Sequence, residues 1–200
     1  MTFLFLDKIF DMEVRKHMEF YRRMPDENVL VDCIWKWIID IVIVIIAGMF
    51  LAGYLCKVEN VIGNSMSPVM KSEEKVFVDT MQYNIFSPDK GDVILFKVES
   101  ITGVTEKYMK RIIAVPGETV LIKDGSVYVN DKKIKTDDEI VNPGLAGEEI
   151  KLGHDEYFVL GDNYNNSEDS RFSSIGNVRE EDIIGKVWLR VAPFARIGIV

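Results

Sequence analysis

Cysteine and histidine are scarce in this sequence, and the few that occur exclude two kinds of site. Cys33 and Cys56 flank a long apolar segment, so they cannot pair within one chain and no disulfide framework is expected. The two histidines, His17 and His154, are too few for a zinc site built from histidine and cysteine. A Ser-His-Asp triad would have to use His154, which lies in a predicted surface turn at residues 152–155. We therefore expect neither a metal nor a cofactor.

Basic residues are also too few and too scattered for a nucleic-acid partner. No long run of lysine or arginine occurs, and the formal net charge is -8. A nucleic-acid surface needs a basic face, so we expect no such partner. The hydrophobic fraction of 48% and the charged fraction of 28% are typical of folded proteins. A length of 200 residues accommodates one ordinary domain and an anchor.

One apolar segment, residues 34–56, predicts a transmembrane helix. Residues 38–56 contain a single charge, Asp40, and as a helix they span a bilayer core of about 30 Å. Trp35 and Tyr54 lie where interfacial aromatic residues belong. A cleaved signal peptide would be shorter and would start earlier in the chain. No second apolar segment follows, so we expect a single crossing.

The segment before the anchor, residues 1–33, mixes charged and apolar residues. Phe3, Leu6, Phe10 and Val14 fall at near-helical spacing, which favours a short amphipathic helix at a membrane surface. A loose tail fits the same residues equally well.

Residues 57–200 form the predicted soluble domain, and their pattern is mostly β. An Asp-Gly pair, Asp124 and Gly125, between two strand patterns is a strong hairpin signal. Residues 136–150 are polar and predict a loop. The predicted strands cover residues 75–79, 93–98, 108–115, 119–123, 126–130, 157–160 and 183–191. Many short strands without a clear helix indicate antiparallel β-sheets or a small barrel.

A turn shortly after the anchor carries a candidate nucleophile, Ser65. Gly63 permits a turn and the close approach of another chain, and Pro68 stops a helix or a central strand. A serine on such a turn can present its hydroxyl to a peptide, with backbone N–H groups nearby to hold the oxyanion. The same residues also fit an ordinary turn after a strand.

A candidate base, Lys110, lies in the predicted strand at 108–115. A lysine acts as a base only when it is neutral, and burial among apolar residues favours that form. Alternation along the strand places Arg111 on the opposite face, where it can meet a carboxylate such as Asp162. The alternative is a solvated Lys-Arg pair on an edge strand.

Four motifs in this order, after one membrane anchor, resemble type I signal peptidases. They occupy residues 63–68, 91–96, 108–118 and 161–171, and the resemblance covers the anchor and essentially all of 57–200. Gly63, two positions before Ser65, and the short path between the second and third motifs resemble the Gram-positive bacterial type. The family members of the eukaryotic endoplasmic reticulum carry histidine in place of this lysine. Lys110 therefore points to a bacterial plasma membrane.

The resemblance implies a membrane-bound serine endopeptidase that removes signal peptides from exported preproteins with a Ser/Lys dyad. Ser65 is then the nucleophile, Lys110 is the general base and Ser167 orients the lysine ammonium. The residues that brace the site are Asp162, Asp169 and Arg171. With Gly63 in place of the serine of some members, the oxyanion hole has to use backbone N–H groups, including that of Ser65.

The resemblance also implies the partners and the topology. The partners are signal-peptide-bearing preproteins and the lipid bilayer. Residues 1–33 are then an N-terminal cytoplasmic segment, 34–56 the transmembrane helix and 57–200 the extracytoplasmic catalytic domain. Five apolar residues are expected to form the walls of the substrate site: Val61, Ile62, Met66, Tyr108 and Met109.

Two other functions remain open at this point. A self-cleaving Ser/Lys protease shares the expected fold, but it would need an N-terminal DNA-binding helix pair and no anchor. An anchored β-domain that binds exported chains without cutting them would not need the Ser65–Lys110 pair.

Overall fold

The protein is described by a computed structural model that covers residues 27–99, 103–136 and 138–200. These residues divide into two units, of which one ends at Leu51 and the other spans Ala52–Val200. The amphipathic helix predicted before the anchor falls largely on residues 1–26, outside the described residues.

The first unit contains most of a long helix, α2 (Glu27–Leu55). Its segment Val31–Phe50 has a mean hydropathy of 2.2 and is long and apolar enough to cross a membrane. The helix begins at Glu27, before the predicted anchor.

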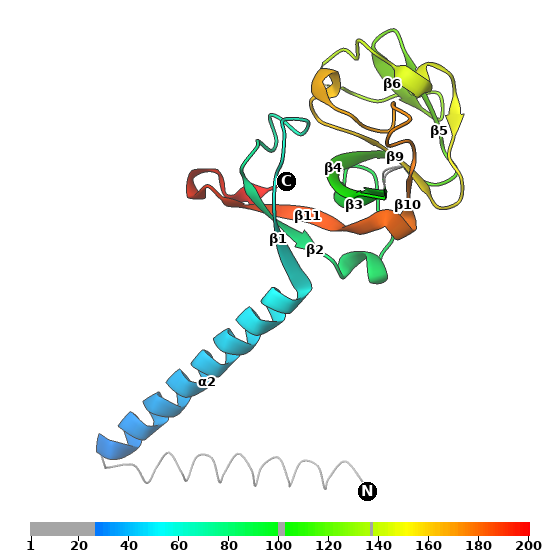
Figure 1. The fold of residues 1–200 in the computed structure, drawn as a ribbon. Helices are drawn as coiled ribbons and strands as arrows, with labels where there is room; N and C mark the ends of the chain where they lie inside the picture. The colour runs from blue at the N-terminus through cyan, green and yellow to red at the C-terminus, as the bar shows by residue number, and fades with distance from the viewer. Residues whose placement is uncertain (1–26, 100–102, 137) are drawn as a thin grey trace, which may run out of the picture. The chain divides into compact units, whose positions relative to one another are not determined.

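The second unit is built from two antiparallel sheets (Figure 1). The larger, eight-stranded sheet has the order β1-β2-β11-β3-β4-β9-β10, and β12 pairs with β11. Its strands are β1 (Cys56–Asn60), β2 (Lys75–Asp79), β3 (Val93–Glu99), β4 (Thr105–Ala114), β9 (Glu156–Leu160), β10 (Val178–Arg179), β11 (Ile183–Ala192) and β12 (Gly198–Ile199). The expectation of a mostly β, antiparallel fold is therefore confirmed.

The smaller sheet has four strands in the order β7-β6-β5-β8. They are β5 (Thr119–Lys123), β6 (Ser126–Val129), β7 (Lys132–Lys133) and β8 (Ile150–Lys151). Asp124 and Gly125 have φ of 50° and 68°, as a tight hairpin between β5 and β6 requires, so the predicted turn is confirmed. In Figure 1, β5 and β6 lie at the end of this unit away from β1 and β2.

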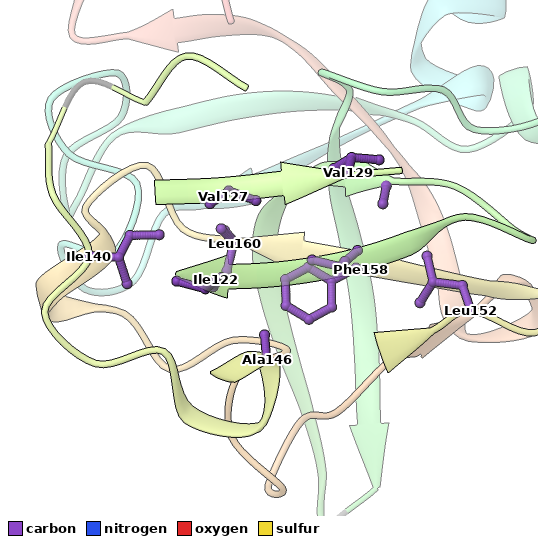
Figure 2. Packing of buried hydrophobic residues seen from close by; sticks show 10 residues of the cluster. Ile122, Val127, Val129, Ile140, Ala146, Leu152, Phe158 and Leu160 are labelled. Atoms are coloured by element: carbon purple, nitrogen blue, oxygen red, sulfur yellow. The ribbon is translucent and has the colours of Figure 1, made fainter. Parts of the chain in front are cut away.

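A hydrophobic core joins the two sheets (Figure 2). Phe158 and Leu160 of β9 are fully buried against Ile122 of β5 and against Val127 and Val129 of β6. Each large apolar side chain removed from water in this way stabilises the fold by roughly 1.5–3 kcal/mol. The contact fixes β9, and with it the loop that follows β9, relative to the rest of the domain.

Short 3-10 turns connect several strands. They are η1 (Gln82–Asn84), η2 (Gly144–Gly147), η3 (Tyr164–Asn166), η4 (Glu180–Asp182) and η5 (Phe194–Arg196). The predicted loop at 136–150 contains η2 and ends at the first residue of β8.

The strand predictions differ from the structure mainly at polar edges. The predicted strands at 75–79 and 119–123 have the observed bounds of β2 and β5. The five strands without a prediction are β1, β7, β8, β10 and β12, of which all but β1 have two residues. β4 begins at Thr105, before the predicted start at 108, because Thr105 and its neighbours pair with the end of β3. Such polar strand ends are held by backbone pairing and carry no apolar alternation in the sequence.

Candidate active site

The segment between β1 and β2, residues 61–74, is a closed loop that carries Ser65 and is called the nucleophile loop below. Its ends are joined by Val61 N donating to Glu74 O at 2.8 Å and Glu73 N donating to Val61 O at 2.9 Å. Gly63 has φ of 80°, a left-handed conformation that glycine adopts without strain. The loop thus leaves the larger sheet after β1 and returns to it at β2, with its two ends held together by hydrogen bonds.

Two methionines anchor the nucleophile loop in the core of the larger sheet. Met66 and Met70 are 1% and 0% exposed, and they pack in one cluster with Val76, Val78 and Leu95. Met70 N also donates to Met66 O at 2.8 Å. Ser65 directly precedes the buried Met66 and is itself half-buried. Its side chain is therefore attached to a rigid support.

Lys110 lies within β4 and is only 2% exposed. Its Nζ lies 5.9 Å from the ring centroid of Tyr108, which occupies the same face of the strand. Burial is the largest effect on this lysine and lowers its pKa from 10.5 to about 8. Asp169 and Glu168 act against that shift, and Arg171 adds to it. A dry environment for Lys110 is thus confirmed, and the alternative of a solvated Lys-Arg pair is wrong.

Ser65 and Lys110 line the same cleft, which has a volume of about 380 Å³. All five predicted wall residues line it as well: Val61, Ile62, Met66, Tyr108 and Met109. The sequence prediction missed the other lining residues, which are Glu59, Asn60, Leu95, Glu106 and Lys107. The cleft is thus bounded by residues 59–62 on one side and residues 106–110 on the other.

Lys107 and Glu59 connect the two sides of this cleft. Lys107 Nζ donates to Glu59 Oε1 at 2.7 Å. Next to this pair, the Tyr108 hydroxyl donates to Glu106 Oε2 at 2.6 Å. Glu106 and Lys107 lie four and three positions before Lys110 on β4, and Glu59 lies on β1, six positions before Ser65.

The motif at 161–171 holds the backbone of Ser65. Asn163 N donates to Ser65 O at 2.9 Å, and Asn163 Nδ2 donates to Asn64 O at 3.3 Å. Gly161 lies so close that an added Cβ would come within 2.3 Å of Ser167 Oγ and 2.5 Å of Ser65 O. Only a residue without a side chain therefore fits at position 161.

Two carboxylate–arginine pairs brace this motif, as the sequence predicts. Arg111 binds Asp162 through two hydrogen bonds of 2.7 and 2.8 Å, which confirms that pair. Asp169 and Arg171 are buried and form a second bidentate pair at 2.7 and 2.9 Å. Arg171 also donates to backbone carbonyls, including Asn142 O at 3.0 Å, so its charge is fully paired as burial demands.

Ser167 lies beside Gly161, close to the backbone of Ser65. Its hydroxyl oxygen is buried and has no hydrogen-bond partner within the part of the chain that the structure describes. The structure thus shows no hydrogen bond from Ser167 to the Lys110 ammonium, and the orienting role of Ser167 stays a prediction. A buried hydroxyl without a partner is costly, which makes Ser167 Oγ an available group beside Ser65 and Gly161.

His154 lies outside the site, with a side chain that is 95% exposed in a surface turn, as expected. Among residues 27–99, 103–136 and 138–200, no group of three or more His, Cys, Asp or Glu side chains is placed to hold a metal ion.

A buried acidic residue, Glu74, supports the nucleophile loop and was not found from the sequence. It is 4% exposed and pairs with Arg190 and Arg196, which come from β11 and from the segment after it. The separation along the chain hides this contact from any local pattern.

Known proteins of one family are similar to this chain over most of its length. A family model described as "Signal peptidase, peptidase S26" matches residues 34–192. Signal peptidase I T of Bacillus subtilis is 33% identical over 171 residues, which is 80% of this chain and 86% of that protein. Signal peptidase IB of Staphylococcus aureus is 30% identical over 182 residues, which is 81% of this chain and 91% of that protein.

Two further similar proteins have a lower sequence identity to this chain. The probable signal peptidase I-2 of Synechocystis is 27% identical over 182 residues, covering 90% of this chain and 81% of that protein. A crystal structure of a signal peptidase I from Enterococcus faecalis is 28% identical with a TM-score of 0.41, covering 51% of this chain and 97% of that chain. On the extent of the family match and the identity to the Bacillus protein, this chain belongs to the signal peptidase family, peptidase S26.

Proposed function

We propose that this protein is a membrane-anchored serine endopeptidase that removes signal peptides from exported preproteins, with Ser65 as nucleophile and Lys110 as general base. The observation that carries the proposal is the cleft in which a half-buried serine and a buried lysine of lowered pKa meet apolar walls. Relatives named signal peptidase I, from Bacillus and Staphylococcus, support the same function.

The reaction follows from the protonation state of Lys110. With a pKa of about 8, roughly one-tenth of Lys110 is neutral at pH 7 and about half at pH 8, and the neutral form can accept the Ser65 hydroxyl proton. Ser65 Oγ then bonds to the scissile carbonyl carbon, and backbone N–H groups, including that of Ser65, stabilise the oxyanion. When the C–N bond breaks, the Lys110 ammonium gives its proton to the leaving amine.

The second half of the reaction reuses the same pair. Lys110, neutral again, takes a proton from a water molecule as that water attacks the acyl-enzyme carbonyl. The ester bond to Ser65 breaks, Ser65 recovers its proton from Lys110, and the signal peptide leaves as a carboxylate. Ser167, whose buried hydroxyl has no partner among the described residues, is available to orient the Lys110 ammonium during this cycle.

Two open strand edges bound the cleft and suit an extended substrate. β1 is the terminal strand of the larger sheet, and in β4 only Arg111, Ile112 and Ala114 pair with β9. The part of β4 before Arg111 therefore has its second edge unpaired within the described chain. An extended peptide can add to such an edge through backbone hydrogen bonds.

Substrate selectivity follows from the walls. In an extended peptide, the first and third residues before the cut face the same side. The walls there are apolar and fairly large, which leaves room for small side chains and favours an Ala-X-Ala pattern.

We assign α2 as the single transmembrane helix on the strength of its apolar Val31–Phe50 segment. In this topology residues 1–33 are cytoplasmic, 34–56 form the transmembrane helix and 57–200 are the extracytoplasmic domain. A domain outside the plasma membrane meets preproteins as they emerge, which is where a signal peptidase has to act.

The test is cleavage of a preprotein in detergent by the wild type, Ser65→Ala and Lys110→Ala. Ser67→Ala is the matched control, because Ser67 lies in the same turn and Ser67 N donates to Asn64 O through its backbone alone. We expect mature protein from the wild type and Ser67→Ala, and none from the other two variants. Binding of the preprotein without cleavage by the wild type would instead identify a non-catalytic domain.

A further inference from the structure

The nucleophile loop is also held by a cluster that the proposed chemistry does not use. This cluster, called the arginine clamp here, consists of Glu74, Arg190 and Arg196. Glu74 ends the loop and its backbone carbonyl accepts from Val61 N at 2.8 Å, four positions before Ser65. The clamp therefore acts on the same short segment that carries the nucleophile.

Glu74 is the centre of the clamp. Its side chain is 5% exposed, and a buried carboxylate has to be paired to remain charged. Arg196 Nη1 donates to Glu74 Oε1 at 2.5 Å, Lys71 N donates to Oε2 at 3.0 Å, and Arg190 Nη1 lies 3.7 Å from Oε2. Glu74 thus joins its own loop to two arginines far along the chain.

The same two arginines also bind the loop backbone directly. Arg196 Nη2 donates to Pro68 O at 3.1 Å, and Arg190 Nη1 donates to Val69 O. Arg190 Nε donates to Arg196 O, which ties the two arginines to each other. The carbonyls of Pro68 and Val69 belong to residues three and four positions after Ser65. A guanidinium can reach a carboxylate and a carbonyl at once because of its planar fork of donors.

We propose that Arg190 and Arg196, with Glu74, are positioning residues that set the attack geometry of Ser65. Asn163 N donates to Ser65 O, and the clamp binds the carbonyls of Pro68 and Val69 that follow Ser65. A displacement of about 1 Å in an attacking group can cost roughly 100-fold in rate. The inference rests on the proposed function, in which Ser65 is the nucleophile.

Arg196→Ala in the full-length protein is the test variant, because the Arg196 side chain is 31% exposed and its loss leaves no large cavity. Arg179→Ala is the matched control. Arg179 also pairs with a carboxylate, Glu181 at 2.6 Å, but it lies on β10 and contacts no residue of the nucleophile loop. The measurements are kcat and KM for a preprotein, with thermal unfolding to give the folded fraction.

We expect Arg196→Ala to lower kcat by about 10- to 100-fold per folded molecule, with KM changed by less than about 3-fold. Arg196→Lys keeps the charge for Glu74 but loses the fork, so we expect it to recover part of kcat. Arg179→Ala should match the wild type. If Arg196→Ala does not fold, the comparison of Arg196→Lys with the wild type decides the question by the same kcat and KM criterion.

The positioning role of the clamp is contradicted if the wild type cuts the preprotein and a folded Arg196 variant cuts it with an unchanged kcat. It is equally overturned if Arg179→Ala lowers kcat as much as Arg196→Ala does. Both results leave the proposed function standing, because the wild type remains active, so the two failures are distinguishable.

Discussion

Burial gives Lys110 its chemistry. An ammonium that is 2% exposed has lost most of its water, and the nearby carboxylate Asp169 is already paired with Arg171. The attraction from Asp169 and Glu168 therefore compensates only part of the desolvation, and the pKa falls to about 8. The same burial that prepares a base at neutral pH also destabilises the folded protein whenever Lys110 is charged.

This cost predicts a pH dependence of stability. Below the folded pKa of about 8, Lys110 is charged in both states and the folded protein carries the full penalty. Between pH 8 and 10.5 the unfolded chain still binds a proton that the folded protein has released, so stability rises with pH. Relative to Lys110→Met, the wild type should gain about 3 kcal/mol in free energy of unfolding across this range.

The measurement is urea unfolding of both proteins at several pH values between 7 and 11. Lys123→Met is the control, because Lys123 is exposed at the end of β5 and should show no such difference. A constant difference between the wild type and Lys110→Met at every pH would contradict the burial account.

At the scale of elements, the site depends on two loops that meet at their backbones. The nucleophile loop and the motif at 161–171 touch through Ser65 O, which accepts from Asn163 N. Gly161 makes this contact close enough, because any Cβ there would collide with Ser65 O and with Ser167. The position of Ser65 thus depends partly on the lack of a side chain at Gly161.

Gly161→Ala should therefore damage activity more than stability. Its Cβ would meet Ser65 O at 2.5 Å, so one loop has to move. We expect overpacking to cost about 1–3 kcal/mol in stability and kcat to fall by at least about 10-fold. Gly147→Ala is the control, since its Cβ would meet nothing closer than Pro143 Cγ at 3.4 Å. Equal kcat for the two variants would show that the contact does not position Ser65.

The two strand edges around the cleft predict which substrate positions matter. A preprotein series with Leu or Phe at the third residue before the cut should lose turnover sharply, because the side chain meets apolar walls such as Met66 and Met109. The same changes at the second residue should have little effect, because that side chain points away. If the second position proved the more sensitive one, the extended docking along β4 would have to be abandoned.

The sequence predicts those strands in which apolar and polar residues alternate within the strand itself. β2, β5 and most of β4 follow this pattern, and the Asp124–Gly125 hairpin has its own turn signal. β1 was missed, because its polar segment Lys57-Val58-Glu59-Asn60 becomes a strand only by pairing with β2. The arginine clamp was missed for the same reason. Glu74 and its partner Arg196 are 122 positions apart, and no local sequence pattern indicates such a contact.

At the scale of the whole chain, the proposed topology predicts that the proposed nucleophile works near the bilayer. Ser65 lies nine residues after Cys56, and nine extended residues span at most about 30 Å. Apolar side chains on the domain are exposed, with Phe86 at 65% and Ile85 at 72%. Phe77 is half-buried and therefore less available for contact with lipid.

A protein without residues 1–56 should therefore remain an enzyme but depend on an amphiphile. We expect detergent or lipid vesicles to raise its turnover of a preprotein, and Phe86→Ser to reduce that stimulation. The exposed polar variant Lys90→Ser is a control for changes near Phe86. Equal activity of the truncated protein with and without lipid would contradict a working contact between this domain and the membrane.

The most direct test of the account is the dependence of kcat/KM on pH for cleavage of one preprotein. Because neutral Lys110 is the proposed base, kcat/KM should rise from acid pH and level off above an apparent pKa of about 8. Ser67→Ala should reproduce this profile, and Lys110→Ala should have no measurable rate at any pH. A wild-type profile that is flat between pH 6 and 9, or that peaks in acid, would contradict a lysine base.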